Sequence, residues 1–342
     1  MNSSIREMNA FVIDEPNKAR LRSVRKPSPV GDEVLIKIIA SGFCGTDIHI
    51  MRGEHPSNYP LIPGHEFSGV VEAVGDGVRQ FKSGDLVVAD PNIFCESCHY
   101  CKQNKQIHCE NLQCLGITRD GAFAEYVTVP ERCVFSAEGI DLVQGSMAEP
   151  LGCVIHAHNN TPIPIGGTVA VFGAGTIGLM HLMLSRRRGA AKTIMIDLNP
   201  AQLEKAKKLG ADETYVSTPD IHRVLAEKYP RGFSTIIDAT GVPSVLEKAI
   251  PLLAKTGTFV CFGVCPADSS IRINPFDFYD RDWKLIGNNS LIKTMPQALD
   301  MLRGGLDLSP LIGGVITLEQ VPEWFADFSA GKTSGKIIVK FS

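Results

Sequence analysis

Short apolar runs separated by polar turns fill the first 150 residues of the chain. The segments Val34–Ile39, Phe67–Val74 and Leu86–Ala89 each have the length and the residue types of a β-strand. Turn-forming residues stand between them, as in Gly75-Asp76-Gly77. This part of the chain therefore predicts an irregular domain rich in β-strands.

After about residue 152, apolar strands alternate with helical stretches. We predict strands at Thr168–Phe172, Thr193–Ile196, Thr235–Asp238 and Thr258–Phe262, and a helix at Ala201–Leu209. Such alternation is typical of βαβ units, whose strands form a parallel sheet with helices on its faces. The sequence therefore predicts an α/β protein that contains a doubly wound parallel-sheet domain.

The alternation is lost from about residue 287, and the chain ends on another apolar strand, Lys336–Phe341. We interpret the parallel-sheet domain, residues 153–286, as an insertion into the β-rich domain. The β-rich domain then consists of residues 1–152 and is completed by residues 287–342.

Composition and charge limit the partners. With 44% hydrophobic and 21% charged residues and a net charge of −3, the 342-residue chain is of ordinary globular type, without a basic excess for nucleic acid or a membrane surface. It has no apolar run of about 18 residues, and Met1–Met8 lacks the apolar core of a signal peptide. We expect a cytoplasmic protein that binds a small molecule, with its ten cysteines serving metal ligation or thiolate chemistry and not disulfides.

A glycine-rich segment, Gly173–Gly178, follows a predicted strand, opens an apolar helix and fits the pattern G-x-G-x-x-G. In dinucleotide-binding folds the first glycine forms a tight turn, the second lets the backbone approach the pyrophosphate, and the third allows close helix–strand packing. The N–H groups at the helix start then face the phosphates. The predicted cofactor contacts in this segment are Gly173, Gly175, Thr176, Ile177 and Gly178.

Asp197, 19 residues after Gly178, ends the next predicted strand. Its carboxylate can accept hydrogen bonds from the ribose hydroxyls of NAD and would repel the 2′-phosphate of NADP. The residues that follow, Leu198-Asn199-Pro200, include no Arg or Lys to pair with that phosphate. The pattern therefore favours NAD, with a purely structural βαβ turn as the alternative.

Four cysteines, Cys95, Cys98, Cys101 and Cys109, have the spacing C-x2-C-x2-C-x7-C. Four thiolates this close in sequence can form a tetrahedral shell around Zn²⁺ and leave no position open, which makes such a zinc structural. Similar spacings serve iron–sulfur clusters, and unligated loop cysteines are the remaining alternative. We favour structural zinc.

Two further segments hold candidate ligands outside this quartet. Cys44 lies in the segment GFCGTDIH, residues 42–49, and His65-Glu66 lies in PGHEFSG, residues 63–69. Here the sequence resembles the zinc-containing medium-chain dehydrogenase/reductase family. It matches the family signature G-H-E-x2-G-x5-G-x2-V through Gly64, Gly69, Gly75 and Val78, and the likeness extends over the cysteine loop, the glycine-rich segment and the terminal Gly335–Val339.

The resemblance implies a GroES-like catalytic domain, a Rossmann domain and a catalytic zinc bound by Cys44 and His65. Glu66 would be a third or exchangeable ligand, and Asp47 would orient the imidazole of His65. Glu149 stands where the liver-type alcohol dehydrogenases have a cysteine, and a glutamate there is the pattern of the sorbitol and threonine dehydrogenase branches. With the cysteine quartet, the resemblance implies two zinc ions per chain.

The chemistry implied by the family is hydride transfer from a secondary alcohol to NAD. A zinc ion with an open position stabilises the substrate alkoxide. Thr46 takes the hydroxyl proton and passes it through the cofactor ribose to His49. His49 suits the end of this relay because imidazole exchanges protons near neutral pH. The resemblance also implies a cis Tyr59–Pro60 peptide bond, and a homodimer or homotetramer built by strand pairing near Lys284–Asn288.

We predict a polyol or a sugar acid as the substrate, because a carboxylate-rich metal site can bond hydroxyls beside the reacting one. Ile50 stands where animal sorbitol dehydrogenases have Tyr, and Asn288-Asn289-Ser290 replaces a segment that ends in Arg, so sorbitol itself is not implied. Asn289 and Ser290 are candidate substrate contacts. The alternatives are an amino-alcohol dehydrogenase of the threonine 3-dehydrogenase kind and, in another class, a non-catalytic nucleotide-binding structural protein.

Overall fold

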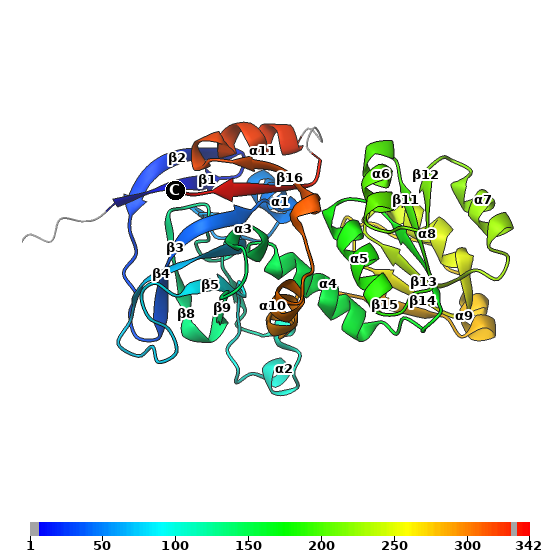
Figure 1. Cartoon of the computed structure of the whole chain (residues 1–342), viewed down its shortest axis with the longest axis horizontal. Coiled ribbons are helices and arrows are strands. Elements are labelled where there is room, and N and C mark those ends of the chain that lie inside the picture. The colour runs from blue at the N-terminus through cyan, green and yellow to red at the C-terminus, as the bar shows by residue number, and fades with distance from the viewer. Residues whose placement is uncertain (1–6, 330–333) are drawn as a thin grey trace, which may run out of the picture. The chain divides into compact units, whose positions relative to one another are not determined.

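The computed structural model describes residues 7–329 and 334–342. The chain divides into two compact units, residues 1–152 with 291–342 and residues 153–290, whose elements are labelled in Figure 1. Residues 1–6, part of the segment in which the sequence shows no signal-peptide core, lie outside the described residues. Within the described ranges no helix is long and apolar enough to cross a membrane.

A seven-stranded sheet organises the first unit. Its order is β16 (Ile312–Ile316), β17 (Lys336–Lys340), β3 (Glu33–Gly42), β4 (Glu66–Val74), β5 (Leu86–Ala89) and β9 (Val134–Ser136), with β8 (Tyr126–Pro130) also paired to β3. Strand β3 is long, and most of its side chains are buried. It pairs with β4 along one edge and, along the other, with β8 at residues 33–37 and with β17 at residues 40–42.

The C-terminal tail supplies two strands of this sheet. Strands β16 and β17 run parallel to each other, and β17 then pairs antiparallel with the end of β3. Ile337, Ile338 and Val339 of β17 are buried, so the apolar run at the end of the sequence becomes core. Figure 1 shows this strand, in red, beside the blue strands from the start of the chain.

The second unit is built on a six-stranded parallel sheet. Its order is β12 (Glu213–Val216), β11 (Lys192–Asp197), β10 (Thr168–Phe172), β13 (Phe233–Asp238), β14 (Leu253–Cys261) and β15 (Lys284–Gly287). In chain order this is 3-2-1-4-5-6, the arrangement of the doubly wound dinucleotide-binding fold. The predicted α/β class, with its parallel-sheet domain, is confirmed.

Helices connect these strands: α5 (Thr176–Arg187), α6 (Pro200–Lys208), α7 (Ile221–Lys228), α8 (Pro243–Ala249) and α9 (Pro275–Arg281). The unit keeps residues 287–290, which the sequence assigned to the tail. The physical reason is that β15 completes the sheet by pairing with residues 258–261 of β14. The first unit therefore resumes at Leu291, which is fully buried.

Candidate metal and cofactor sites

Helix α1 (Gly45–Arg52) presents three of the predicted site residues. Cys44 caps the helix start, and Asp47 accepts a hydrogen bond from the Cys44 backbone N–H at 2.9 Å, which closes a capping box. Thr46 Oγ1 lies 3.6 Å from Cys44 Sγ. His49 follows one turn later in the same helix. The cap therefore fixes the Cys44 thiol at the start of a rigid element.

His65 and Glu66 come to Cys44 from the start of β4. Glu66 pairs in register with Gly42 of β3, two residues before Cys44. Ligand atoms of Cys44, His65 and Glu66 all lie within 4.8 Å of one another. A Cβ on Gly42 would lie 2.3 Å from a carboxylate oxygen of Glu66, so only glycine leaves room for this side chain. The nearby Tyr59–Pro60 peptide bond is cis, as predicted.

This three-residue group is buried and offers a donor set of the kind that binds a cation. His65 and Glu66 are 5% and 1% exposed. His65 Nδ1 and Glu66 Oε2 are buried atoms without a hydrogen bond among the described residues. Each nevertheless faces an opposite charge, since Asp47 Oδ1 lies 3.5 Å from His65 Nδ1 and Lys336 Nζ lies 2.7 Å from Glu66 Oε2. One thiol, one imidazole and one carboxylate are a donor set that zinc accepts, so the residues present fit the predicted ion.

Asp47 lies beside His65, in the place expected of the carboxylate that was predicted to orient its imidazole. Its Oδ1 atom is 3.5 Å from His65 Nδ1, longer than a hydrogen bond, and accepts one from the Gly64 backbone at 3.2 Å. Burial alone would lower the pKa of His65, but the charges of Asp47 and Cys44 outweigh it and raise that pKa well above its ordinary value. The influence of Asp47 on His65 is therefore electrostatic.

Lys336 is a site residue that the sequence did not reveal. This buried lysine of β17 donates hydrogen bonds from Nζ to Glu66 Oε1 at 2.7 Å and to the Phe43 carbonyl at 3.0 Å. Burial would lower the pKa of Lys336, but the charges of Glu66 and Cys44 raise it, so the lysine keeps its charge. In the sequence, the only sign of this role was a lysine at the start of an apolar strand, and nothing there indicated which residue it would contact.

Glu149 is in the same buried neighbourhood, but it is not one of the three converging ligands. It lies in the first turn of α4 (Ala148–Asn160) and is 8% exposed. Its charge contributes to the raised pKa values of Cys114 and Lys336. Its predicted place near the metal stays a prediction.

Two further side chains, those of Glu54 and His55, lie near His49. Oε2 of Glu54 lies 2.7 Å from His49 Nδ1. His55 lies near both His49 and His65: burial lowers the pKa of His55, and the charges of those two histidines lower it further. Neither residue carried a signal in the sequence, since each is an ordinary polar residue after a helix.

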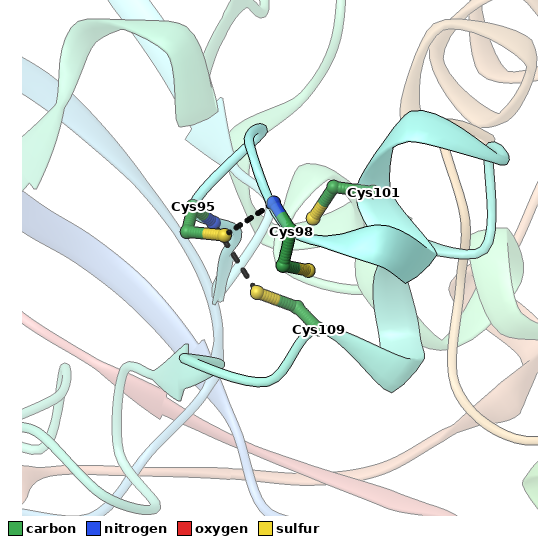
Figure 2. A group of neighbouring side chains, drawn as sticks. All are labelled: Cys95, Cys98, Cys101 and Cys109. Atoms are coloured by element: carbon green, nitrogen blue, oxygen red, sulfur yellow. Dashed lines mark hydrogen bonds between the residues drawn. The ribbon is translucent and has the colours of Figure 1, made fainter.

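The cysteine quartet forms a second group, in the loop around α2 (His99–Lys102). Its four sulfur atoms lie within 4.8 Å of one another, and Figure 2 shows the four thiols together. Tetrahedral zinc with Zn–S bonds of about 2.3 Å needs sulfur atoms about 3.8 Å apart, so only small adjustments would close the shell.

Backbone N–H groups support charge on these sulfurs. Cys98 N–H donates to Cys95 Sγ at 3.4 Å, and Cys95 N–H donates to Cys109 Sγ at 3.3 Å. The backbone of Ser97 and Cys98 lowers the pKa of Cys95 to about 5. Burial and the neighbouring sulfurs raise the pKa of Cys101 to about 12. Four thiolates together therefore need a cation, and the donor set fits zinc.

The glycine-rich segment has the geometry that its motif predicts. Gly173 adopts φ 98°, and a Cβ on Gly178 would lie 1.8 Å from the Gly173 carbonyl, so turn and packing both need glycine. Gly175 instead faces open space, because a Cβ placed on it would have no atom within 4 Å. It caps the N-terminus of α5, where Thr176 and Ile177 begin the helix. This open helix terminus fits a pyrophosphate.

Asp197 sits at the end of β11 beside that segment. Its Oδ2 accepts a hydrogen bond from the Ala174 backbone at 2.6 Å, and its Oδ1 accepts one from Asn199 at 2.7 Å. These bonds hold the carboxylate where a ribose would lie.

The two candidate substrate contacts lie just after β15. Asn289 is exposed, and Ser290 has a left-handed φ of 51°. Their substrate role stays a prediction.

Family models match both units. One described as "Alcohol dehydrogenase GroES-like domain" matches residues 31–139, and one described as "Zinc-binding dehydrogenase" matches residues 176–304. The two matches together cover the group of Cys44, His65 and Glu66, the cysteine quartet and most of the parallel-sheet unit.

Whole-length relatives show the same likeness. D-altritol 5-dehydrogenase of Agrobacterium fabrum is 35% identical over 89% of this chain and 92% of its own. L-threonine 3-dehydrogenase of Burkholderia vietnamiensis is 31% identical over 94% and 96%. A Sinorhizobium meliloti protein described as a zinc-binding dehydrogenase, solved with NADP, superposes with a TM-score of 0.93 at 32% identity, over 98% of this chain and 100% of that one.

Proposed function

Since the chain belongs to the polyol-dehydrogenase-like branch of the zinc-containing medium-chain dehydrogenases, we propose that it oxidises a secondary alcohol of a polyol or sugar acid, with NAD as hydride acceptor. The chain is a zinc-type dehydrogenase that uses a nicotinamide cofactor; the substrate class and the choice of NAD are the proposal. The observation that carries it is the buried group of Cys44, His65 and Glu66, whose ligand atoms converge within 4.8 Å of one another.

We assign the catalytic zinc to Cys44 and His65, with Glu66 as an exchangeable ligand and Glu149 near the metal. When bound, zinc polarises the substrate hydroxyl, and the cofactor accepts the hydride. Thr46 accepts the hydroxyl proton, since its own hydroxyl lies beside Cys44, and His49 returns the proton to solvent. Lys336 fixes the Glu66 carboxylate by donating a hydrogen bond to its Oε1.

The cofactor proposal rests on Asp197. A carboxylate fixed by two backbone N–H groups cannot turn away from a 2′-phosphate without losing both bonds. The structural relative solved with NADP makes this choice worth measuring directly. We propose contacts to NAD from Gly173, Gly175, Thr176, Ile177, Gly178 and Asp197.

The second zinc is assigned to the cysteine quartet, which gives two ions per chain.

We also propose a homodimer or homotetramer in which the outer strand β15 pairs with its copy. Leu285 of β15 is 41% exposed, and Phe276 and Tyr279 of α9 are 63% and 82% exposed, which is costly for apolar side chains unless they are covered. Ten free cysteines suit the reducing cytoplasm.

The substrate proposal is tested by nicotinamide reduction, followed by absorbance, on a panel of tetritols to hexitols, hexonates, threonine and ethanol, each with NAD and NADP. We expect the highest kcat/KM for a polyol or hexonate with NAD. Threonine preferred by about tenfold would favour the amino-alcohol alternative, which the threonine dehydrogenase relative keeps in view. Absence of turnover on every substrate class would favour a non-catalytic protein.

A further inference from the structure

We propose that Glu54 is a positioning residue for the proton relay. Its carboxylate holds the imidazole of His49 as the tautomer that carries hydrogen on Nδ1, which leaves Nε2 free to take a proton. Glu54 Oε2 lies 2.7 Å from His49 Nδ1, and in the described part of the chain no hydrogen bond reaches Nε2. The inference deepens the proposed function and rests on it, because that function gives His49 its relay role.

The end of helix α1 brings the two side chains together. Gly53 has a left-handed φ of 75°; its N–H donates to Ile50 O at 3.0 Å, and the Glu54 N–H donates to His49 O at 2.8 Å. This pair of bonds is a Schellman motif. The motif that ends the helix therefore bonds the backbone of Glu54 to that of His49. A Cβ on Gly53 would also lie 2.9 Å from Pro16. Glycine is therefore required at this position both for its left-handed backbone and for lack of space.

The helix places the relay residues in sequence. Thr46 and His49 are three residues apart, so they are neighbours on one helix face. Thr46 Oγ1 lies 3.6 Å from Cys44 Sγ, next to the ligand group. A proton that leaves a hydroxyl near Cys44 thus meets Thr46 before it meets His49.

Only one tautomer of His49 can complete the transfer. An N–H bond forms at Nε2 while the O–H bond of the donor breaks, and Nε2 then gives its proton to solvent, so the imidazole ends as it began. This needs Nε2 without hydrogen at the start, and a carboxylate that accepts a hydrogen bond from Nδ1–H provides that state. A histidine in the opposite tautomer would have its hydrogen at the receiving atom.

The pair contributes little to folding, so its role can be separated from stability. The side chains of His49 and Glu54 are 54% and 50% exposed, and exposed ion pairs stabilise proteins only weakly. Glu54→Gln should therefore leave the melting temperature close to that of the wild type. It should nevertheless change the tautomer, because a glutamine amide can donate to Nδ1 as well as accept from it.

The first test is spectroscopic and needs no turnover. Protein labelled with nitrogen-15 histidine is compared by NMR with Glu54→Gln, with His49→Asn to assign the signals, and with Glu15→Gln as a control at another exposed pair. We expect His49 to carry hydrogen on Nδ1 in the wild type and in Glu15→Gln, and to become a mixture in Glu54→Gln. An unchanged His49 spectrum in Glu54→Gln would overturn the positioning role.

The second test is kinetic. Glu54→Gln should lower kcat for alcohol oxidation by about tenfold, within the range of general acid–base contributions, and leave KM for substrate and cofactor nearly unchanged. A changed tautomer with unchanged kcat would overturn the place of Glu54 in the reaction. A wild-type protein that oxidises no alcohol would instead refute the proposed function, and the NMR result would still report the tautomer.

Discussion

The ion pair between Lys336 and Glu66 should be among the most stabilising polar contacts of the first unit. Lys336→Met keeps much of the length of the side chain and removes its charge. Because Glu66 is 1% exposed, its carboxylate would remain buried near the Cys44 thiol with no cation from the protein beside it. Breaking one side of a buried ion pair costs about 3–5 kcal/mol, and we expect Lys336→Met to fall in that range.

The same substitution at Lys18 is a matched control. Lys18 pairs with Glu15, but its side chain is 73% exposed, and such exposed pairs contribute about 0–1 kcal/mol. The double variant Lys336→Met with Glu66→Gln should recover part of the loss, because no charge is then left buried without a partner.

The two tryptophans allow each unit to be followed separately. Trp324 lies in α11 (Val321–Ser329) of the first unit, and Trp283 lies in the second. In a Trp283→Phe background, guanidinium unfolding followed by fluorescence reports the first unit, at equal zinc for all variants. A loss for Lys336→Met as small as that for Lys18→Met would refute the reasoning, since Glu66 would then have no need of the lysine.

Three further outcomes follow from the structure. Asp197→Ser should shift the preference from NAD toward NADP by about 1–3 kcal/mol, measured as the ratio of the two kcat/KM values; a wild type that prefers NADP would contradict this. Cys98→Ser should lose one zinc by metal analysis and melt earlier, because ligation stabilises the fold. His158 and His181 are buried with nitrogens 3.0 Å apart, and burial lowers the pKa of His158 to about 3 and that of His181 well below its ordinary value. Their stabilising effect is complete above about pH 6.5 and falls as pH drops toward 3, by about 2 kcal/mol per histidine at pH 5; thermal unfolding of the His158→Asn/His181→Asn variant should show a weaker acid dependence, and an equal one would refute this.

Local sequence was sufficient where the chemistry is local. The quartet of cysteines spans one loop, and the glycine-rich segment spans one turn, so spacing alone predicted both groups and the structure brings each together. The alternation of strands and helices likewise predicted the parallel sheet, and only the last residue of β15 and the three that follow it were assigned to the tail.

Contacts between distant segments could not be predicted in this way. Lys336 reaches Glu66 across 270 residues of sequence, and only the pairing of β17 with β3 places them together. Glu54 was missed for a different reason. Its approach to His49 depends on a left-handed glycine at the helix end. A glutamate after a glycine is also common on protein surfaces without a functional role, so the sequence did not single it out.

The central claim is that Cys44 and His65 hold a zinc ion on which alcohol oxidation depends. The most direct measurement is zinc content and polyol-dependent NAD reduction on the same preparations of wild type and Cys44→Ser, purified without chelator. We expect about two zinc ions per wild-type chain, by the ligand sets, and about one in a folded Cys44→Ser protein that has lost turnover. A Cys44→Ser protein that keeps both its zinc and its activity would contradict the account.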